Sequence, residues 1–349
     1  MKKEKIILAV LSLVMIAGSM LSLNMLIEHI QGQEVVERID AAEAKKGKGS
    51  SKDTKKAGIT EKPFQVLVSG MDITGSLKQN RPYRNDSNLL LTVNPVDKKI
   101  LITNLPREIY VKPVDVPEFS EKDAENMKLS GMTEDQIKEA KEARKTGMKT
   151  KLCHVSLYGM PSLVKTVEGV LDTKIDYHIQ LTMTGFKTLV DAIGGVDVEA
   201  VESFETDWGT SYQKGINHVN GKEAVAFVRE RHHFNDGALG RGTNNVEMMR
   251  AIIHKLCDAS LLDMDADGLY QLWKNNVETD MGMGEVLSLL RMQVEDRAEW
   301  KITTVIVKGE GSLEKTMEYP GIKLFVLIPD PASVKEAQEK IADVCKVDQ

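Results

Sequence analysis

The sequence predicts an α/β protein, an α/β/α sandwich whose central mixed sheet is flanked by helices, behind an N-terminal transmembrane helix. Short apolar runs alternate with segments of helical periodicity along most of the chain, as in α/β folds. Of the 349 residues, 42% are hydrophobic, enough for a sizeable core. The net charge is only −6, which argues against nucleic acid as the main partner.

An uncharged apolar run from Ile6 to Ile27 predicts the membrane anchor, since it is long enough to cross a bilayer as a helix. Lys2, Lys3 and Lys5 precede this run and Glu28 follows it. The positive-inside rule therefore places the N-terminus in the cytoplasm and the remaining chain outside. A cleaved signal peptide is the alternative, although its apolar region is normally shorter and a small-residue cleavage site follows closely. We expect an uncleaved, single-pass protein of the cell membrane.

The organisation that we expect has four parts. Residues 1–28 form a cytoplasmic stub and the anchor, and residues 29–62 form an extracellular linker, because Lys45 to Lys56 lacks apolar residues and periodicity. Residues 63–260 form the main domain, with an insertion at 113–150. Residues 261–349 form a C-terminal α/β portion that packs on the main domain or continues it.

The first half of the main domain is predicted from apolar runs. Residues 64–69, 89–93 and 100–104 indicate strands, and the turn residues at 94–99 join the last two into a hairpin. Residues 114–150 are polar, with one exposed helix at 133–143, and indicate a surface insertion that covers or flanks the site. Leu163, Val164, Val167 and Val170 have helical spacing, so a helix is expected at 161–170, followed by a strand at 176–181.

The second half continues the alternation. A helix at 184–193 ends at Gly194 and Gly195, and the alternating residues 196–200 indicate a strand. A short helix at 221–227 leads to an arginine cluster, and apolar residues on one side predict a long helix at 244–260. We expect a helix near 284–294, strands at 302–307 and 323–328, and a last helix at 331–344.

Three cysteines, Cys153, Cys257 and Cys345, are widely spaced and form no CxxC or zinc pattern. Small buried apolar side chains are the expected role. A Cys153–Cys257 disulfide stays open, since both residues are expected outside the cell.

Arginines and carboxylates gather beside the predicted strands, and they are the candidate site residues. Guanidinium groups bind phosphate through paired donors, and carboxylates hold hard divalent cations. Together with the anchor, this pattern predicts an enzyme that acts on a lipid-linked pyrophosphate. The candidate pyrophosphate ligands are Arg84, Arg107, Arg229, Arg231 and Arg241.

Asp72 and Asp86 are the expected ligands of a Mg²⁺ ion that bridges phosphate oxygens, and one carboxylate would take the proton of an attacking hydroxyl. Arg229 and Arg231 alternate, which predicts one shared face of an extended segment. The catalytic set is Asp72, Asp86, Arg107, Arg229 and Arg231, with Lys151, His154, Asp236 and Asn244 as additional candidates. Each of these residues also has an ordinary structural interpretation as a turn residue, an ion-pair partner or a surface charge.

Other chemistries have little support. His232 and His233 are adjacent and no second ligand stands at a fixed spacing, which disfavours zinc. The chain has no GxSxG, HExxH or P-loop motif.

The order of the motifs resembles the LytR–CpsA–Psr family of cell-wall glycopolymer transferases. The resemblance runs from Phe64 to the helix after Arg241, and the tail at 319–329 is like the clostridial branch. The matching segments are Gly70–Asp72, Arg84–Asp86, Val93–Pro95, Pro106–Glu108, Lys151 with His154, Tyr158–Gly159, Asp191–Asp197, Asn220–Arg229 and Gly240–Arg241.

The resemblance implies transfer of a glycopolymer (teichoic acid, capsule or a related glycan) from an undecaprenyl-pyrophosphate carrier to a peptidoglycan sugar hydroxyl, outside a Gram-positive cell. It implies that Mg²⁺ assists, that arginines hold the pyrophosphate and that apolar helices form a lipid groove. The helices that contain Leu163 and Met249 are candidates for that groove.

Departures from the family pattern leave alternatives open. Many members have arginine where this chain has Thr74 and aspartate where it has Ala238, and Glu108 replaces an aspartate. Asp236 is a candidate substitute for the missing carboxylate. The alternatives are a catalytically inactive wall- or polyprenyl-pyrophosphate-binding protein with a regulatory or scaffold role, and a polyprenyl-pyrophosphate hydrolase.

Overall fold

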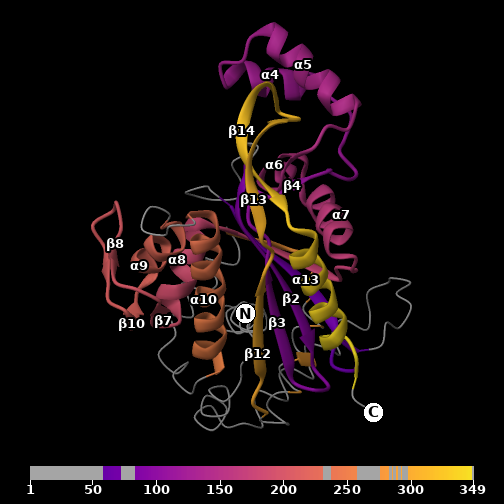
Figure 1. Cartoon of the computed structure of the whole chain (residues 1–349). Helices are drawn as coiled ribbons and strands as arrows, with labels where there is room; N and C mark the ends of the chain where they lie inside the picture. Colours follow the sequence, from indigo (N-terminus) through magenta and orange to yellow (C-terminus); the bar gives the residue numbers. More distant parts are fainter. Residues whose placement is uncertain are drawn as a thin grey trace, which may run out of the picture.

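The computed structural model describes residues 58–71, 83–230, 237–257, 276–282, 285, 288–289, 292 and 298–347. Its centre is a mixed six-stranded sheet of order β11–β6–β1–β2–β3–β12 (Figure 1). Strand β2 is antiparallel to both β1 and β3, whereas β6 is parallel to β1 and β12 is parallel to β3. The strands are β1 (Phe64–Met71), β2 (Asn85–Asn94), β3 (Lys99–Asn104), β6 (Tyr177–Thr182), β11 (Val277–Thr279) and β12 (Lys301–Ile306).

Helices cover both faces of this sheet, as predicted. Val66 and Val68 of β1 face one core, with α8 (Met183–Ala192), α9 (Gly221–Arg229) and α10 (Gly237–Cys257). Leu67, between them, faces a second core with α6 (Leu152–Val155), α7 (Met160–Leu171) and α13 (Pro331–Val344). Because side chains of a strand alternate between faces, the apolar run of β1 supplies both cores.

The membrane anchor predicted at 6–27 lies outside the described residues. Among the residues that are described, no helix has the length and apolar character to span a bilayer.

The C-terminal residues complete the sheet, because β12 pairs with β3 at one edge. A long hairpin of β13 (Gly309–Thr316) and β14 (Tyr319–Pro329) follows and extends toward the insertion (Figure 1). Sequence analysis predicted only a part of β14, at 323–328. It missed β13 because this strand is largely polar.

The insertion contains two helices, α4 (Glu121–Leu129) and α5 (Glu134–Lys145), where one was expected. Each begins with a capping box, Ser120 with Asp123 and Thr133 with Gln136. Helix α4 buries no residue, so it lacks the apolar periodicity by which helices are recognised. Helix α5 packs on β14, and short strands β4 (Tyr110–Val111) and β5 (Thr150–Lys151) pair at the base of the insertion.

Two helices differ from the prediction in ways that affect the site. Helix α10 begins at Gly237, not at 244, so Arg241 lies on a helix. Helix α9, capped by Asn220, continues to Arg229, which therefore does not lie on the extended segment predicted for Arg229 and Arg231. Smaller pairs, β7 (Val196–Ala200) with β10 (Gly215–Val219) and β8 (Phe204–Glu205) with β9 (Ser211–Tyr212), lie beside these helices.

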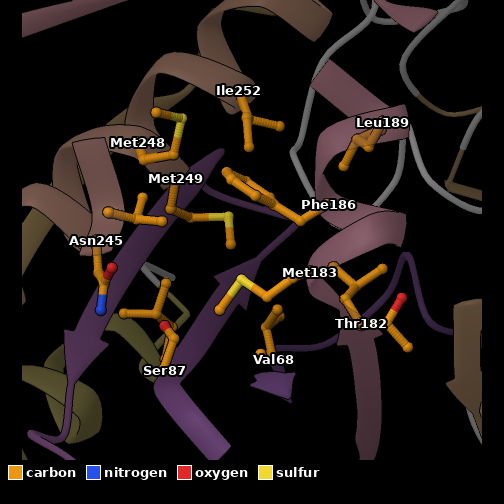
Figure 2. Close-up of a pocket in the computed structure, with 14 residues that line it drawn as sticks. Val68, Ser87, Thr182, Met183, Phe186, Leu189, Asn245, Met248, Met249 and Ile252 are labelled. Carbon is orange, nitrogen blue, oxygen red and sulfur yellow. The ribbon is translucent and has the colours of Figure 1, made fainter. Parts of the chain in front are cut away.

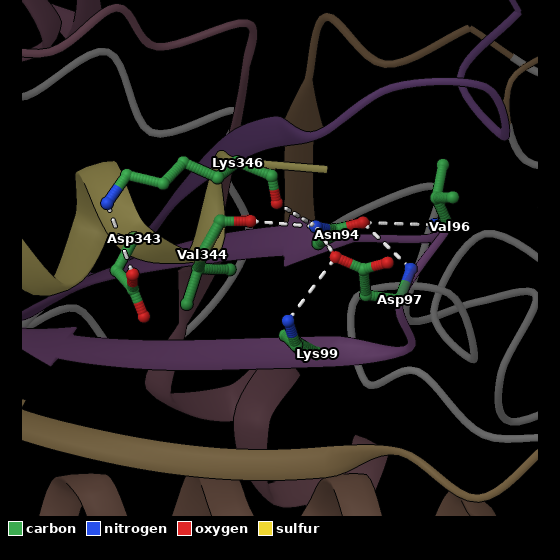
Figure 3. Close-up of polar contacts among 7 residues, drawn as sticks. All are labelled: Asn94, Val96, Asp97, Lys99, Asp343, Val344 and Lys346. Atoms are coloured by element: carbon green, nitrogen blue, oxygen red, sulfur yellow. Dashed lines mark hydrogen bonds and ion pairs between the residues drawn. The ribbon is translucent and has the colours of Figure 1, made fainter. Parts of the chain in front are cut away.

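The predicted β2–β3 turn also holds the end of the chain (Figure 3). The Asn94 Oδ1 atom accepts hydrogen bonds from the backbone nitrogens of Val96 and Asp97, at 3.1 and 3.0 Å. Its Nδ2 atom donates to the carbonyl oxygens of Val344, at 2.8 Å, and Lys346, at 3.0 Å. One amide side chain thus shapes the turn and holds the end of α13 against it.

The start of α9 tolerates no side chain larger than hydrogen at Gly221. The backbone nitrogen of Gly221 donates to Asp191 Oδ1 at 2.7 Å, and a Cβ atom there would overlap the carbonyl oxygen of Lys187 in α8. We expect Gly221→Ala to lower the free energy of unfolding by about 2–3 kcal/mol, because backbone must shift to remove the overlap. Urea denaturation would measure the change.

Gly169 of α7 provides the matched control. A Cβ atom at this exposed helical position meets nothing within 4 Å. Gly169→Ala should therefore raise the free energy of unfolding by about 0.5–1 kcal/mol. Equal stabilities of the two variants would show that α8 and α9 do not pack as described.

Candidate active site

The candidate site centres on a chain of alternating charges from the start of β2, the residues after β3 and helix α10. Arg107, just after β3, forms an ion pair with Asp86 and lies with its Nε atom 3.3 Å from Glu108 Oε1. Arg241, from α10, places its Nη2 atom 3.2 Å from each Glu108 oxygen. Asp86, Glu108 and Arg241 are each less than a tenth exposed. Two carboxylates and two guanidinium groups thus compensate one another in a buried setting.

Glu108 has a role that sequence reasoning did not find. It was noted only as a longer substitute for an aspartate, yet its carboxylate bridges Arg107 and Arg241 from different elements. Removing it would leave the buried Arg241 without this counter-charge.

A bulge directs Asp86 toward the cluster. Gly70 pairs with Ser87, whereas Met71 pairs with Asn85, so Asp86 is the extra residue on β2. Bulges are frequent beside active sites because they redirect one side chain. Met71 is also the last described residue before Asp72, which lies outside the described part of the chain, as do Arg231 and Asp236.

A second polar cluster surrounds Glu318, at the β13–β14 turn. His154 Nδ1 lies 2.9 Å from Glu318 Oε2, Tyr158 donates its hydroxyl hydrogen to Oε1 at 2.6 Å, and Thr150 also donates to Oε2. Burial lowers the pKa of His154, so its neutral ring donates through Nδ1. Burial raises the pKa of Tyr158. Burial also acts to raise the pKa of Glu318, but the hydrogen bonds outweigh it and lower that pKa.

The same turn orients Arg84. Its Nη2 atom donates to the Tyr319 hydroxyl at 2.8 Å, and its guanidinium carbon lies 5.8 Å from the centre of that ring. Lys151 is nearby, and its pKa is lowered chiefly by burial, with Arg107 and Arg84 contributing. The β13–β14 turn therefore links Arg84 to the His154 cluster.

The remaining candidates have structural contacts. The Arg229 guanidinium lies 5.4 Å from the centre of the Trp208 ring, at the last residue of α9. Asn244 donates from Nδ2 to the carbonyl oxygen of Phe227 at 2.9 Å, so it ties α10 to the end of α9. Asn244 thus supports the backbone that presents Arg229.

Of the cysteine side chains that the structure describes, Cys153 is buried and Cys345 is partly buried. Cys153 and Cys345 are free thiols, so the Cys153–Cys257 disulfide does not form. Burial raises the pKa of Cys153, which disfavours its reactive thiolate.

The described residues include one of the two expected Mg²⁺ ligands, Asp86. Within the described ranges, no group of three or more His, Cys, Asp or Glu side chains is arranged to hold a metal. Proteins usually hold Mg²⁺ through one or two carboxylates together with substrate phosphates. Asp86, at a strand end among arginines, fits as one such ligand.

An apolar pocket lies next to the charge chain, between the sheet and helices α8 and α10 (Figure 2). Met183 and Phe186 of α8 and Met248, Met249 and Ile252 of α10 line it. Its volume is about 80 Å³, which is small for a lipid chain. Side chains must therefore move if it is to admit one, and the flexible methionines suit such movement.

The pocket also corrects an expectation about the lipid groove. The helix containing Met249 does line it. The helix containing Leu163 does not, because α7 belongs to the core on the opposite face of the sheet.

Sequence reasoning missed Glu318 and Tyr319 as site residues. Glu318 is 164 positions from His154 in the chain, and only the folding of the β13–β14 hairpin joins them. The one available signal was the family-like tail beginning at Tyr319, which had been given no role.

Fold and site together define an α/β protein with a buried arginine–carboxylate cluster beside an apolar pocket. The model of the LytR_cpsA_psr family matches residues 28–326, and the chain belongs to this family.

Two curated relatives are similar in sequence. The chain is 31% identical over 280 residues to "Biofilm regulatory protein A" of Streptococcus mutans, covering 76% of this chain and 61% of that protein. It is 28% identical over 279 residues to "Polyisoprenyl-teichoic acid--peptidoglycan teichoic acid transferase TagU" of Bacillus licheniformis, covering 80% of this chain and 79% of that protein.

The crystal structure of B. subtilis TagV shares the fold. It has a TM-score of 0.60 at 23% sequence identity, covering 83% of this chain and 99% of that chain. This likeness supports the predicted architecture of a mixed sheet between helices.

Proposed function

We propose that this protein is a membrane-anchored extracellular phosphotransferase. It would move a glycopolymer from an undecaprenyl-pyrophosphate carrier to a peptidoglycan sugar hydroxyl. The observation that carries the proposal is that the charge chain adjoins the apolar pocket. Ser87 and Asn245 line the pocket, next to Asp86 along β2 and one turn from Arg241 along α10. A substrate with a pyrophosphate joined to a lipid needs both surfaces side by side.

The family supports the same chemistry, since the TagU relative is named as a teichoic acid transferase that acts on polyisoprenyl-teichoic acid and peptidoglycan. In the proposed reaction, the acceptor hydroxyl oxygen attacks the phosphorus that bears the glycan. The bond between this phosphorus and the bridging oxygen breaks, and undecaprenyl phosphate leaves with that oxygen. The hydroxyl proton passes to a carboxylate, for which Asp86 and Asp72 are the candidates.

The arginines would position the pyrophosphate and stabilise its charge. A guanidinium carries five N–H groups, so Arg107 keeps donors beyond those used for Asp86 and Glu108. Arg84, held by Tyr319, would provide further donors. A Mg²⁺ ion held by Asp86, with Asp72 as the proposed second ligand, would neutralise charge on the phosphate oxygens.

The test uses the full chain in a mild detergent, with an undecaprenyl-pyrophosphate-linked glycan and peptidoglycan fragments. We expect undecaprenyl phosphate to be released with Mg²⁺ and release to stop with EDTA. Tight binding of the donor without release, across several glycans, would contradict the proposal.

That outcome would favour an inactive binding protein with a regulatory or scaffold role. Thr74 and Ala238, where many members have an arginine and an aspartate, motivate this second candidate. The Streptococcus mutans relative is also named as a regulatory protein.

A further inference from the structure

A second pocket, of about 670 Å³, lies between the insertion helices and the candidate site. Tyr83 and Arg84, Tyr158 at the end of the 3-10 helix η2 (Ser156–Tyr158), and the Glu318–Tyr319 turn form one side. Helices α4 and α5 form the other, beside the end of the β13–β14 hairpin (Figure 1). The volume lies in the range of roughly 300–1,000 Å³ that is typical of small-molecule sites.

The lining of this pocket combines charged, polar and aromatic side chains with the apolar side chains of Met127, Leu129, Met132 and Leu157. The rings of Tyr83, Tyr158 and Tyr319 line it together with the charged side chains of Arg84 and Asp123. Charged walls disfavour a lipid chain, because burying charges against hydrocarbon is costly. A pyranose sugar has flat C–H faces that pack on aromatic rings and hydroxyl edges that hydrogen-bond to amides, carboxylates and guanidinium groups.

Contacts within the protein hold the walls of the pocket in place. The Arg144 guanidinium carbon lies 4.8 Å from the ring centre of Phe119 and 4.6 Å from that of Tyr158, and Nη1 donates to Asp123 at 3.0 Å. Burial acts to raise the pKa of Asp123, but hydrogen bonds from Ser120 and Arg144 lower it on balance, so its carboxylate stays charged. Tyr158 is fixed by its hydrogen bond to Glu318. A pre-organised pocket loses less entropy when it binds a ligand.

One wall also presents a polar group suited to a ligand. Asn126 of α4 lines the pocket, and its side-chain amide makes no hydrogen bond with any described residue. Arg84 lies on the opposite side and is the candidate phosphate ligand that borders this pocket. A group bound here would therefore adjoin a phosphate held by Arg84.

We propose that this pocket is a carbohydrate subsite that binds a sugar unit of the substrates next to the pyrophosphate. This inference rests on the proposed function. The sugar comes either from the lipid-linked donor glycan or from the peptidoglycan acceptor, and both present the same chemistry to the pocket. The insertion at 113–150 would then serve to build a sugar-binding wall.

The test places a large side chain in the pocket. Asn126→Trp narrows it, whereas Glu125→Trp changes an exposed neighbour on α4 that does not line it. Because α4 buries no residue, both variants should fold, and their unfolding temperatures should match that of the wild type. Asn126→Ala, which removes only the amide, provides a second variant without added bulk.

Binding is measured by calorimetry on the full chain in detergent. The probes are bare undecaprenyl pyrophosphate, the same lipid carrying a glycan, and an N-acetylglucosamine–N-acetylmuramic acid fragment. If the pocket holds the acceptor sugar, Asn126→Trp should bind the saccharide fragment at least tenfold more weakly than the wild type does. If the pocket holds the donor sugar, the variant should instead bind the glycan-carrying lipid at least tenfold more weakly. Binding of the bare lipid should be unchanged.

Unchanged binding of both saccharide probes by Asn126→Trp would overturn the subsite. An equal loss for Glu125→Trp would do the same, because the effect would then not depend on the pocket. Failure of the proposed function is seen separately, as failure of the wild type to bind the bare lipid pyrophosphate or to turn over the donor.

Discussion

Replacing Arg107 by lysine is expected to lower kcat for release of undecaprenyl phosphate by about 10²–10³-fold, while the protein stays folded. Arg107 contacts both Asp86 and Glu108. Lysine keeps the positive charge that these carboxylates need, but it cannot present the planar fork of donors that matches a phosphate. The rate of release, followed together with the unfolding temperature, measures the effect.

Arg250→Lys is the matched control. Arg250 lies on α10 with Arg241, but it forms ion pairs with Glu247 and Glu199, outside the charge chain. The kcat of the Arg250→Lys variant should remain within about twofold of the wild-type value. Wild-type activity of Arg107→Lys would remove Arg107 from the proposed site.

Glu318→Leu is expected to lower the free energy of unfolding by about 3 kcal/mol or more. The change deprives the Thr150, His154 and Tyr158 donors of their shared acceptor, and each buried group left unsatisfied costs about 1–3 kcal/mol. Glu318→Gln keeps one acceptor oxygen and should cost less. Urea denaturation of the wild type, Glu318→Leu and Glu318→Gln gives the order of their free energies of unfolding. Equal stabilities would contradict the description of this cluster.

The same cluster predicts how stability depends on pH. The pKa of His154 is below its ordinary value of 6.5 in the folded protein. The stability that the neutral His154 ring contributes to the fold is therefore complete above pH 6.5 and is lost as the pH falls toward the folded pKa. Glu318 acts in the same direction at lower pH, because its folded pKa lies below 4.5. Between pH 7.5 and 5.5, His154→Gln should therefore lose less stability than the wild type. A steeper loss in the variant would contradict the assigned sign.

The architecture was largely predictable because the central strands of the sheet carry apolar residues on both faces. Strands β1, β2 and β3 stand out as short runs of buried residues, and α7 and α8 show helical spacing. Helix α4 and strand β13 were not predictable in this way, since α4 buries no residue and β13 is mostly exposed.

The candidate site was predictable in part. Arg107 and Glu108 follow a strand, and Asp86 lies near the start of its antiparallel partner, so their proximity follows from the hairpin. The ion pair between Asp86 and Arg107 depends on the bulge at Asp86, and no local sequence pattern predicts this bulge. Glu318 was missed for a similar reason, because a buried carboxylate in a polar strand turn resembles any surface residue until the tertiary contacts are known.

The most direct test of the account is the identity of the product. The full chain is incubated with a short undecaprenyl-pyrophosphate glycan, peptidoglycan fragments and Mg²⁺, and the products are analysed by tandem mass spectrometry. We predict a peptidoglycan fragment joined to the glycan through a phosphodiester, with undecaprenyl phosphate as the second product. Free glycan phosphate as the sole product, despite acceptor in excess, would contradict the transferase and identify a hydrolase.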